Sequence, residues 1–291
     1  MFAELNGAKI FFDVAGLQWV PDGRTMREKP VCLVFHGGPG ASHIGYLSGM
    51  LPLAETMQLI FLDDRSCGLS ERRDYSESTI EQNAADGEAL RKYLGLDKIF
   101  VMGQSYGGMT AQRYALDYQE NLYGAIFLCT AHNWPPRPSE REIVMERGTE
   151  EQKQMWINYE NTGSFGDGIE WTYKMASLYN YRYDESVAAA AVDSYYRAKG
   201  WKNFDMAEYQ IRHGLADFEF IDELRSLKIP VSIFAGKQDF ITSYEHSVEM
   251  HEAIPQSELH VMDQCSHMLF NDRPEYVFPQ IADFVNRNFK K

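Results

Sequence analysis

The sequence has no long hydrophobic run and no excess of positive charge. None of its apolar stretches approaches the roughly 20 residues that span a membrane. Lys and Arg number 28 against 42 Asp and Glu, a net charge of −14, and so acidic a surface repels the phosphate backbone of nucleic acids. The first residues, MFAELNGAKIFFDVAG, lack the basic, apolar and small-residue zones of a signal peptide. We therefore expect a cytoplasmic protein with no nucleic-acid or membrane partner.

Cysteines and metal-binding patterns are also scarce. The four cysteines, at positions 32, 67, 129 and 265, form no CxxC pair, and the eight histidines show no HExxH motif or Cys/His ligand spacing. The sequence therefore predicts no metal site and no cofactor. Cys32 and Cys129 lie inside apolar runs and are predicted to be core residues, and packing is also the predicted role of Cys265.

Aromatic residues, by contrast, are abundant. The 17 Phe, 17 Tyr and 5 Trp supply enough apolar surface for a large core and exclude a disordered chain. Short apolar runs bounded by turn residues are typical of strands buried on both faces of a parallel sheet. They are Val31–Phe35, Leu59–Leu62, Ile99–Met102, Ala125–Leu128, Val231–Ala235 and Leu259–Met262. Helical patterns lie between them, at Ser78–Leu94, Met109–Tyr118, Tyr244–Ile254 and Pro274–Asn288. This alternation predicts an α/β fold with a mostly parallel sheet, preceded by a β-hairpin that turns at Asn6-Gly7.

The alternation stops between residues 132 and 221. The proline-rich segment Trp134–Pro138 opens this stretch, and the rest has helical patterns rich in Trp, Tyr and Phe. We interpret it as a helical cap inserted into a core formed by residues 1–131 and 222–291. Its rings are predicted to form an apolar pocket that can hold an ammonium group by cation–π contact. The alternative is an extra helical layer far from any active site.

The clearest chemical signal is Gly103-Gln104-Ser105-Tyr106-Gly107, which directly follows one predicted strand and precedes a predicted helix. This is the context of a nucleophile elbow, in which the flanking glycines permit a tight turn and leave the serine open to substrate. The N–H groups at the start of the helix favour negative charge beside the serine. Ser105 is therefore the predicted nucleophile.

A serine nucleophile needs a general base, and the base needs an orienting carboxylate. Asp239 and His267 each follow one of the last two predicted strands within a few residues, in the chain order Ser, acid, His. We predict that Asp239 is the orienting acid and His267 the base. His246, His251 and His260 lie within helix or strand patterns and are poorer candidates.

Acyl transfer also requires N–H donors for the developing oxyanion. The N–H of Tyr106, directly after the nucleophile, is one predicted donor. The second is expected from the glycine-rich segment His36–Gly40, which follows the first parallel strand, and either Gly37 or Gly38 fits this role.

Three motifs carry a family resemblance: HGGPG at His36–Gly40, DDRSCGLS at Asp63–Ser70 and GQSYGG at Gly103–Gly108. Together they resemble the proline iminopeptidases, serine peptidases of the α/β-hydrolase fold that remove N-terminal residues from short peptides. The first two motifs are far more specific than GxSxG. The resemblance extends through the core to the C-terminus and is weakest within the cap. It implies an α/β-hydrolase fold.

The chain also departs from this family, whose second motif usually reads Asp-Gln-Arg-Gly where this chain has Asp-Arg-Ser after Asp63. We interpret Asp63, Arg65 and Gly68 as structural residues. The resemblance implies acidic cap residues that bind the substrate's ammonium, and Glu208 is similar to one of them by its spacing to the end of the cap. A solvated helix carboxylate is the alternative. Some relatives have another glutamate after the catalytic acid, where this chain has Phe240, so a neutral or more apolar substrate also fits.

The resulting hypothesis is a serine hydrolase that forms an acyl-enzyme on Ser105. Its expected substrates are short peptides or amino-acid amides with a free N-terminus, proline included. The first alternative is the same machinery acting on carboxylic esters or lactones. Haloalkane or epoxide hydrolysis on this fold uses an Asp nucleophile, which Ser105 argues against. A non-catalytic receptor that keeps the fold and its cleft is the remaining alternative.

Overall fold

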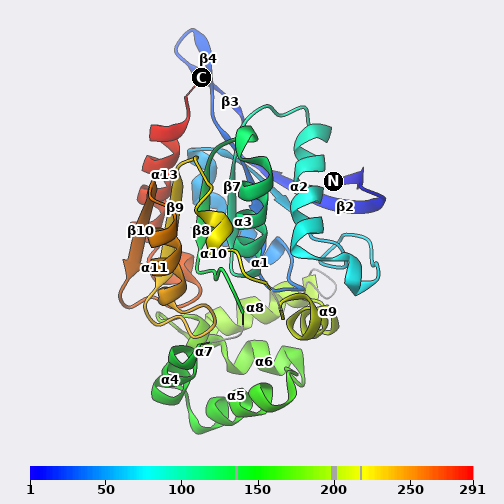
Figure 1. The fold of residues 1–291 in the computed structure, drawn as a ribbon, viewed down its shortest axis with the longest axis vertical. Coiled ribbons are helices and arrows are strands. Elements are labelled where there is room, and N and C mark those ends of the chain that lie inside the picture. Colours follow the sequence, from blue (N-terminus) through cyan, green and yellow to red (C-terminus); the bar gives the residue numbers. More distant parts are fainter. Residues whose placement is uncertain (135–136, 198–201, 217, 291) are drawn as a thin grey trace.

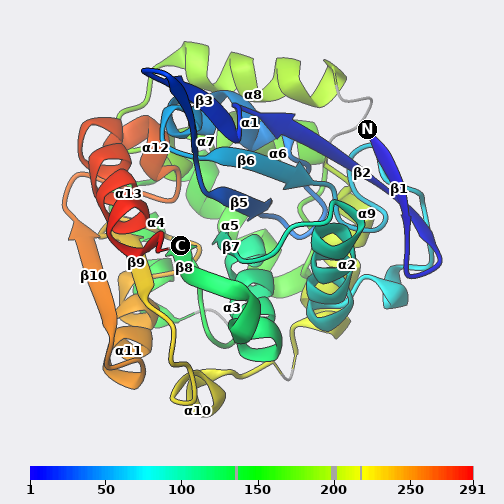
Figure 2. The same ribbon diagram turned by 90° about the horizontal axis from the view of Figure 1, so that it is seen from above.

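The computed structural model describes residues 1–134, 137–197, 202–216 and 218–290. Eight strands form its central sheet, in the spatial order β1 (Phe2–Leu5), β2 (Ala8–Ala15), β6 (Gln58–Leu62), β5 (Val31–Phe35), β7 (Ile99–Gln104), β8 (Leu122–Leu128), β9 (Val231–Gly236) and β10 (Ser257–Met262) (Figure 2). β1 and β2 run antiparallel at one edge, and the other six strands are parallel. The predicted fold is confirmed, and each predicted parallel strand lies within an observed one.

Five of the six parallel strands, β5 to β9, are buried on both faces, because alternate side chains enter two separate layers of the core, whereas the edge strand β10 is only partly buried. On β5, Leu33 and Phe35 belong to one hydrophobic cluster, and Cys32 and Val34 to the other. The first layer also contains α2 (Ile80–Tyr93), α3 (Tyr106–Tyr118) and α11 (Tyr244–Ala253), and the second contains α1 (Ile44–Met50) and α13 (Pro274–Asn288). The four predicted helices are therefore confirmed. All four cysteines are buried and free, so Cys32, Cys129 and Cys265 have the packing role predicted for them.

A helical insertion separates β8 from β9. Its helices are α4 (Pro138–Arg147), α5 (Glu150–Thr162), α6 (Gly168–Lys174), α7 (Ala176–Tyr179), α8 (Glu185–Arg197), α9 (Phe204–Tyr209) and a π-helical turn (Gln210–Gly214). They lie together at one end of the molecule, below the sheet in Figure 1. The short helix α10 (Ile221–Leu224) contacts α3 and α11 of the core instead. The predicted cap is thus present as a helical insertion, while its boundaries at 132 and 221 stay a prediction. Pro135 and Pro136, in its predicted opening segment, lie outside the described residues.

Some short elements had no sequence signal strong enough to predict them. A hairpin of β3 (Trp19–Asp22) and β4 (Thr25–Glu28) occupies a polar stretch, and most of its residues are exposed, so no apolar alternation marks it. The others are α1, a helical turn α12 (Leu269–Asp272) and the 3₁₀ turns η1 (Leu51–Glu55), η2 (Tyr75–Glu77) and η3 (Gln119–Asn121). None of the described helices is long and apolar enough to cross a membrane.

Candidate active site

Ser105 lies in a tight turn at the carboxyl end of β7, near the middle of the sheet. Its backbone has φ 57° and ψ −126°, a region that residues other than glycine seldom adopt. The flanking glycines are required by close backbone approach. A methyl group on Gly107 would lie 2.3 Å from the carbonyl oxygen of Phe35, and one on Gly103 would lie 2.0 Å from that of Gly107. The segment therefore has the strand, turn and helix expected of a nucleophile elbow.

Asp239 and His267 lie close together because β9 and β10, which precede them, are adjacent parallel strands. Oδ2 of Asp239 accepts a hydrogen bond of 2.8 Å from Nδ1 of His267. Oδ1 accepts from the N–H groups of Ile241 and Thr242. Burial by itself raises the pKa of Asp239, but the neighbouring His267 and the two N–H groups bring it below the ordinary value. Asp239 is thus a buried carboxylate with a direct hydrogen bond to the His267 ring, while its role as the orienting acid stays a prediction.

Two cavities adjoin Ser105. The main cavity, of about 400 Å³, is lined by Ser105 and His267 together with residues of α1, α7 and α8. The aromatic pocket, of about 60 Å³, is also lined by Ser105. Its aromatic residues are Tyr106, Trp134, Trp156, Tyr159, Phe165, Trp171 and Tyr179. Because most of these rings belong to the insertion, the insertion covers the carboxyl end of the sheet and is not a remote layer.

The two segments predicted to supply oxyanion donors both adjoin the serine. Tyr106 is the first residue of α3, so its N–H has no acceptor within the helix. Gly38 lines both cavities, whereas Gly37 is not among the described residues that line them. Gly37 is still near, because a methyl group on it would lie 3.1 Å from Cβ of Ser105. Of the two glycines, Gly38 is the one whose surface faces the space available to a substrate.

Glu208, the predicted ammonium anchor, lies on α9 but is not among the described residues that line either cavity. Its Oε1 accepts hydrogen bonds from the Ser164 hydroxyl at 2.7 Å and from the Phe165 N–H at 2.9 Å. Its Oε2 lies 4.0 Å from a guanidinium nitrogen of Arg212. The carboxylate therefore supports the loop that carries one ring of the aromatic pocket. Its role as an ammonium anchor stays a prediction.

Phe240, at the position where some relatives have a second glutamate, is buried in the insertion's own hydrophobic core. Its ring lies 5.6 Å from that of Trp156 and 4.9 Å from that of Tyr179, centre to centre. An aromatic side chain here links the loop after β9 to the insertion. It supplies no charge for an ammonium group.

The segment Asp63–Ser70 forms a buried turn near the site. Oδ1 of Asp63 accepts hydrogen bonds of 2.8 Å from both the backbone N–H and the ring Nδ1 of His43. Arg65 pairs with Asp86 through Nε at 2.6 Å and Nη2 at 2.9 Å. These buried contacts support the structural interpretation of Asp63 and Arg65.

Lys202 lines both cavities although no feature of the sequence singled it out. It lies just before α9, in a part of the chain with no strand register and no motif to indicate which side chains face the site. A lysine among aromatic residues in a helical region is, by sequence alone, indistinguishable from a surface lysine.

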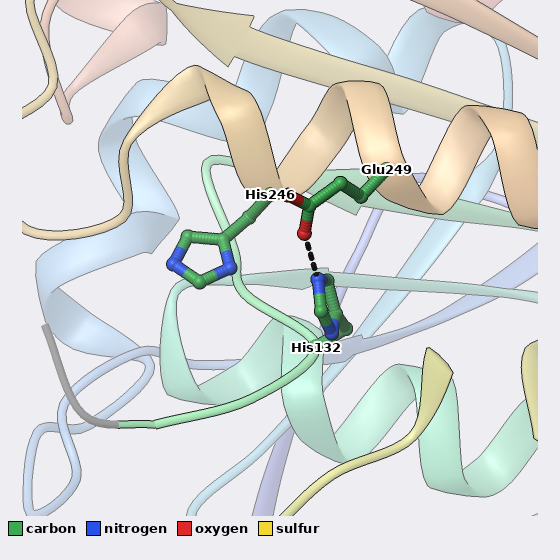
Figure 3. A group of neighbouring side chains, drawn as sticks. All are labelled: His132, His246 and Glu249. Carbon is green, nitrogen blue, oxygen red and sulfur yellow. Dashed lines mark hydrogen bonds and ion pairs between the residues drawn. The ribbon is translucent and has the colours of Figure 1, made fainter. Parts of the chain in front are cut away.

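A second group of histidine and carboxylate side chains lies where the insertion joins the core (Figure 3). His132, just after β8, contacts Glu219 through Nδ1 at 2.9 Å and Glu249 of α11 through Nε2 at 2.6 Å. Arg137 donates to both oxygens of Glu249 and, at 3.1 Å, to Nε2 of His246. The atoms of His132, His246 and Glu249 are close enough to share a metal ion, but the guanidinium already occupies the carboxylate and one of the imidazoles. We refer to these five residues as the anchor cluster, because they tie both ends of the insertion to α11.

Comparison with known proteins agrees with this geometry. The sequence profile of the alpha/beta hydrolase fold family matches residues 30–274. The chain belongs to the α/β-hydrolase fold family. A proline iminopeptidase of Thermoplasma volcanium is 29% identical over 290 residues, which cover 94% of this chain and 92% of that protein. Another proline iminopeptidase, from Clostridioides difficile, is 26% identical, and the aligned region covers 99% of this chain and 98% of that protein. This α/β-hydrolase is therefore homologous to proline iminopeptidases, as its three motifs indicate.

Solved structures of the same fold have diverse activities. The proline iminopeptidase of Mycobacterium smegmatis superposes with a TM-score of 0.74 at 19% identity. The superposition covers 99% of this chain and 98% of the Mycobacterium smegmatis chain. Est816, described as an N-acyl homoserine lactone degrading enzyme, superposes with a TM-score of 0.71 at 21% identity. The superposition covers 98% of this chain and 100% of the Est816 chain. At these identities the structures establish the fold of this α/β-hydrolase and leave its substrate to be argued from the site.

Proposed function

We propose that this protein is a serine hydrolase that releases N-terminal residues, proline included, from short peptides or amino-acid amides. The observation that carries the proposal is that Ser105 and His267 line one cavity while Asp239 hydrogen-bonds the His267 ring. The substrate class is supported by the homology to proline iminopeptidases.

In the first half of the reaction, His267 removes the hydroxyl proton of Ser105 as Oγ attacks the scissile carbonyl carbon. The oxyanion that forms accepts hydrogen bonds from the N–H groups of Tyr106 and Gly38, the glycine that lines both cavities. His267 then donates the proton to the leaving amine as the C–N bond breaks. The acyl group remains as an ester on Ser105.

In the second half, His267 removes a proton from a water molecule that attacks this ester. The second tetrahedral intermediate collapses, the product leaves with a free carboxyl group, and His267 returns the proton to Ser105. Asp239 stays ionised throughout and stabilises the imidazolium, which is consistent with its lowered pKa. No step needs a metal ion or cofactor.

The charge of the cavity walls favours a second candidate, hydrolysis of carboxylic esters or lactones by the same residues. Among the described residues that line the two cavities, none is acidic. Glu208 bonds Ser164 and Phe165, so its carboxylate already has partners. An ester without an ammonium group needs no anionic partner, so its binding carries no free-energy cost for an unpaired substrate charge in these cavities.

The test compares prolyl and alanyl anilides that have a free amine with their N-acetylated forms and with a short-chain nitrophenyl ester. Turnover of the free-amine anilides and rejection of the acetylated ones is the expected result. Ester turnover without anilide cleavage would favour the second candidate. Ser105→Ala should abolish all of these activities while the protein stays folded, and full activity in that variant would overturn both candidates.

Glu208→Gln separates the two roles considered for this residue. An ammonium anchor predicts a raised KM for free-amine anilides and little change for the nitrophenyl ester. A residue that only supports the Phe165 loop predicts similar changes for both substrates, because the pocket wall itself moves.

A further inference from the structure

A lysine lines both cavities beside the nucleophile. Lys202 contributes to the walls of the main cavity and of the aromatic pocket, as Ser105 does. Its Nζ lies 5.3 Å from the centre of the Phe165 ring and 4.8 Å from that of the Phe204 ring. The rings of the insertion were predicted to contact an ammonium group of the substrate. In the structure, two of them contact the ammonium group of Lys202 instead.

No carboxylate neutralises this ammonium within the described part of the chain. The described walls of both cavities contain no acidic residue, and the contacts of Lys202 there are those with the two rings. Glu208, on the helix that follows, bonds Ser164 and Phe165 instead. Burial lowers the pKa of Lys202 to about 8, so the side chain is still mostly protonated at neutral pH.

Such a cation is costly to keep. The Lys202 side chain is half-buried. Its ammonium group has three N–H donors, and contact with aromatic rings offsets only part of the hydration that it loses there. The cost falls when an anion with hydrogen-bond acceptors enters the cavity. Because the surrounding walls are largely apolar, an ion pair formed there is stronger than one on the protein surface.

We propose that Lys202 binds a carboxylate of the substrate, so that preferred substrates carry a carboxylate near the scissile amide or ester bond. This inference rests on the proposed function, because it takes Ser105 as the group that attacks the bound molecule. In a short peptide, the carboxylate is the free C-terminus, on the leaving side of the bond. In an ester, it is a second carboxylate on the acyl chain, as in the half-ester of a dicarboxylic acid. Either source presents the same group to Lys202.

Matched substrate pairs test the inference and distinguish the two sources. The first pair is a prolyl dipeptide and its C-terminal amide, and the second is monomethyl succinate and dimethyl succinate. For at least one pair, the charged member should have a kcat/KM about 10- to 100-fold higher, the range expected of one charge-assisted hydrogen bond. Equal values within both pairs would overturn the inference.

Variants of the lysine give the second comparison. Lys202→Met should remove the preference by lowering kcat/KM for the charged member alone, and Lys202→Arg should keep part of it. Lys228→Met, at an exposed lysine near the start of β9, is the matched control and should keep all of it. An equal loss on the charged and neutral members in Lys202→Met would show a merely structural role and overturn the inference.

Binding to Ser105→Ala separates this inference from the proposed function. Calorimetric titration with glutarate and with glutaramide measures carboxylate recognition without turnover. Tighter binding of glutarate, lost in the Ser105→Ala/Lys202→Met double variant, supports the inference even if no substrate is hydrolysed. Equal binding of the two ligands overturns it. Absence of turnover for every pair, with glutarate binding intact, overturns the proposed function alone.

Discussion

The anchor cluster and the main cavity use the same residue types in different ways. In the anchor cluster, both ring nitrogens of His132 contact carboxylates, those of Glu219 and Glu249. At the cavity, Asp239 hydrogen-bonds one nitrogen of His267, and His267 lines the cavity together with Ser105. A histidine with both nitrogens occupied holds segments together, whereas one with a single orienting partner has a nitrogen left for proton transfer.

The same contrast applies to the cations. Arg137 of the anchor cluster has both oxygens of Glu249 as partners, while Lys202 has two aromatic rings and no carboxylate within the described residues. A charged group beside a cavity, with no partner of opposite charge among the described residues, is a candidate point of contact for a ligand of the opposite charge. Residue type alone does not separate the two regions, whereas the partners of His132 and Arg137 differ in kind from those of His267 and Lys202.

The largest difference is expected between the two histidines. His267→Gln should lower kcat/KM by about 10⁴-fold or more, because the general base is lost. His132→Gln should leave kcat/KM within about 3-fold and lower the melting temperature, because it removes the contacts of His132 with Glu219 and Glu249 and no group at the cavity. Steady-state kinetics and thermal unfolding of both variants check this. Comparable losses of activity would mean that the anchor cluster is part of the catalytic machinery.

The second-largest difference, in kcat, is expected between the carboxylates of Asp239 and Glu249. Asp239→Asn keeps the shape of the side chain but favours the wrong tautomer of His267, so kcat should fall by about 10³- to 10⁴-fold. Glu249→Gln, the matching change in the anchor cluster, should leave kcat nearly unchanged. The kcat values of the two variants on one nitrophenyl ester decide the matter, and a large loss in Glu249→Gln would remove the distinction between the regions.

The lysine beside the two cavities predicts a pH dependence of about 10-fold. Because burial lowers the pKa of Lys202 to about 8, the side chain loses its charge as the pH rises from 7 to 9.5. The ratio of kcat/KM between monomethyl and dimethyl succinate should therefore fall by about 10-fold or more over this range. The ratio isolates Lys202, because the groups that act on the scissile bond affect both substrates alike. Lys202→Arg is the control, since arginine stays charged and its ratio should remain flat. A constant ratio in the wild type contradicts the prediction.

The smallest expected effect concerns stability. Glu249→Gln should lower the free energy of unfolding by about 1 kcal/mol at pH 7. The effect is this small because the Glu249 side chain is 40% exposed, and solvent weakens its ion pair. Glu252→Gln, an exposed position on the same helix, is the control and should have no effect. Urea unfolding of the three proteins measures both differences.

The pH dependence of this stability difference has a definite sign. The hydrogen bonds from Arg137 and then His132 lower the pKa of Glu249 from 4.5 to about 2. A carboxylate whose pKa is lowered in the folded state stabilises the fold at pH values above its unfolded-state pKa. This contribution is lost as the pH falls toward the folded-state pKa. The difference between wild type and Glu249→Gln should therefore shrink between pH 4.5 and pH 2. A difference that grows on acidification would be inconsistent with the ion pairs described.

Regular sheet geometry explains which parts of the site were predictable from sequence. Ser105, Asp239 and His267 each follow a short apolar run, and the carboxyl ends of parallel strands meet at one edge of a sheet. Three positions far apart in the chain could therefore be assigned to one place. The elbow at Gly103 and Gly107 was predictable because close backbone approach permits only glycine there.

The insertion was predictable as a feature but not in its details. Its helices have no common register, so nothing in the sequence indicated that Lys202 lines the cavities or that Glu208 bonds the loop at Phe165. The anchor cluster draws its residues from separate segments, among them His132 after β8 and Glu249 on α11, and such long-range pairing leaves no local pattern. These are the parts of the molecule where tertiary packing, not periodicity, decides position.

The most direct test of the central claim, that Ser105 is a nucleophile activated by His267 beneath the insertion, is active-site labelling with a fluorophosphonate. Intact-mass spectrometry and peptide mapping should show one label on Ser105 in the wild type and in His132→Gln. Ser105→Ala should take up none, and His267→Gln should react at least about 10³-fold more slowly. Labelling of Ser105→Ala, or equal rates for His267→Gln and the wild type, would contradict the account.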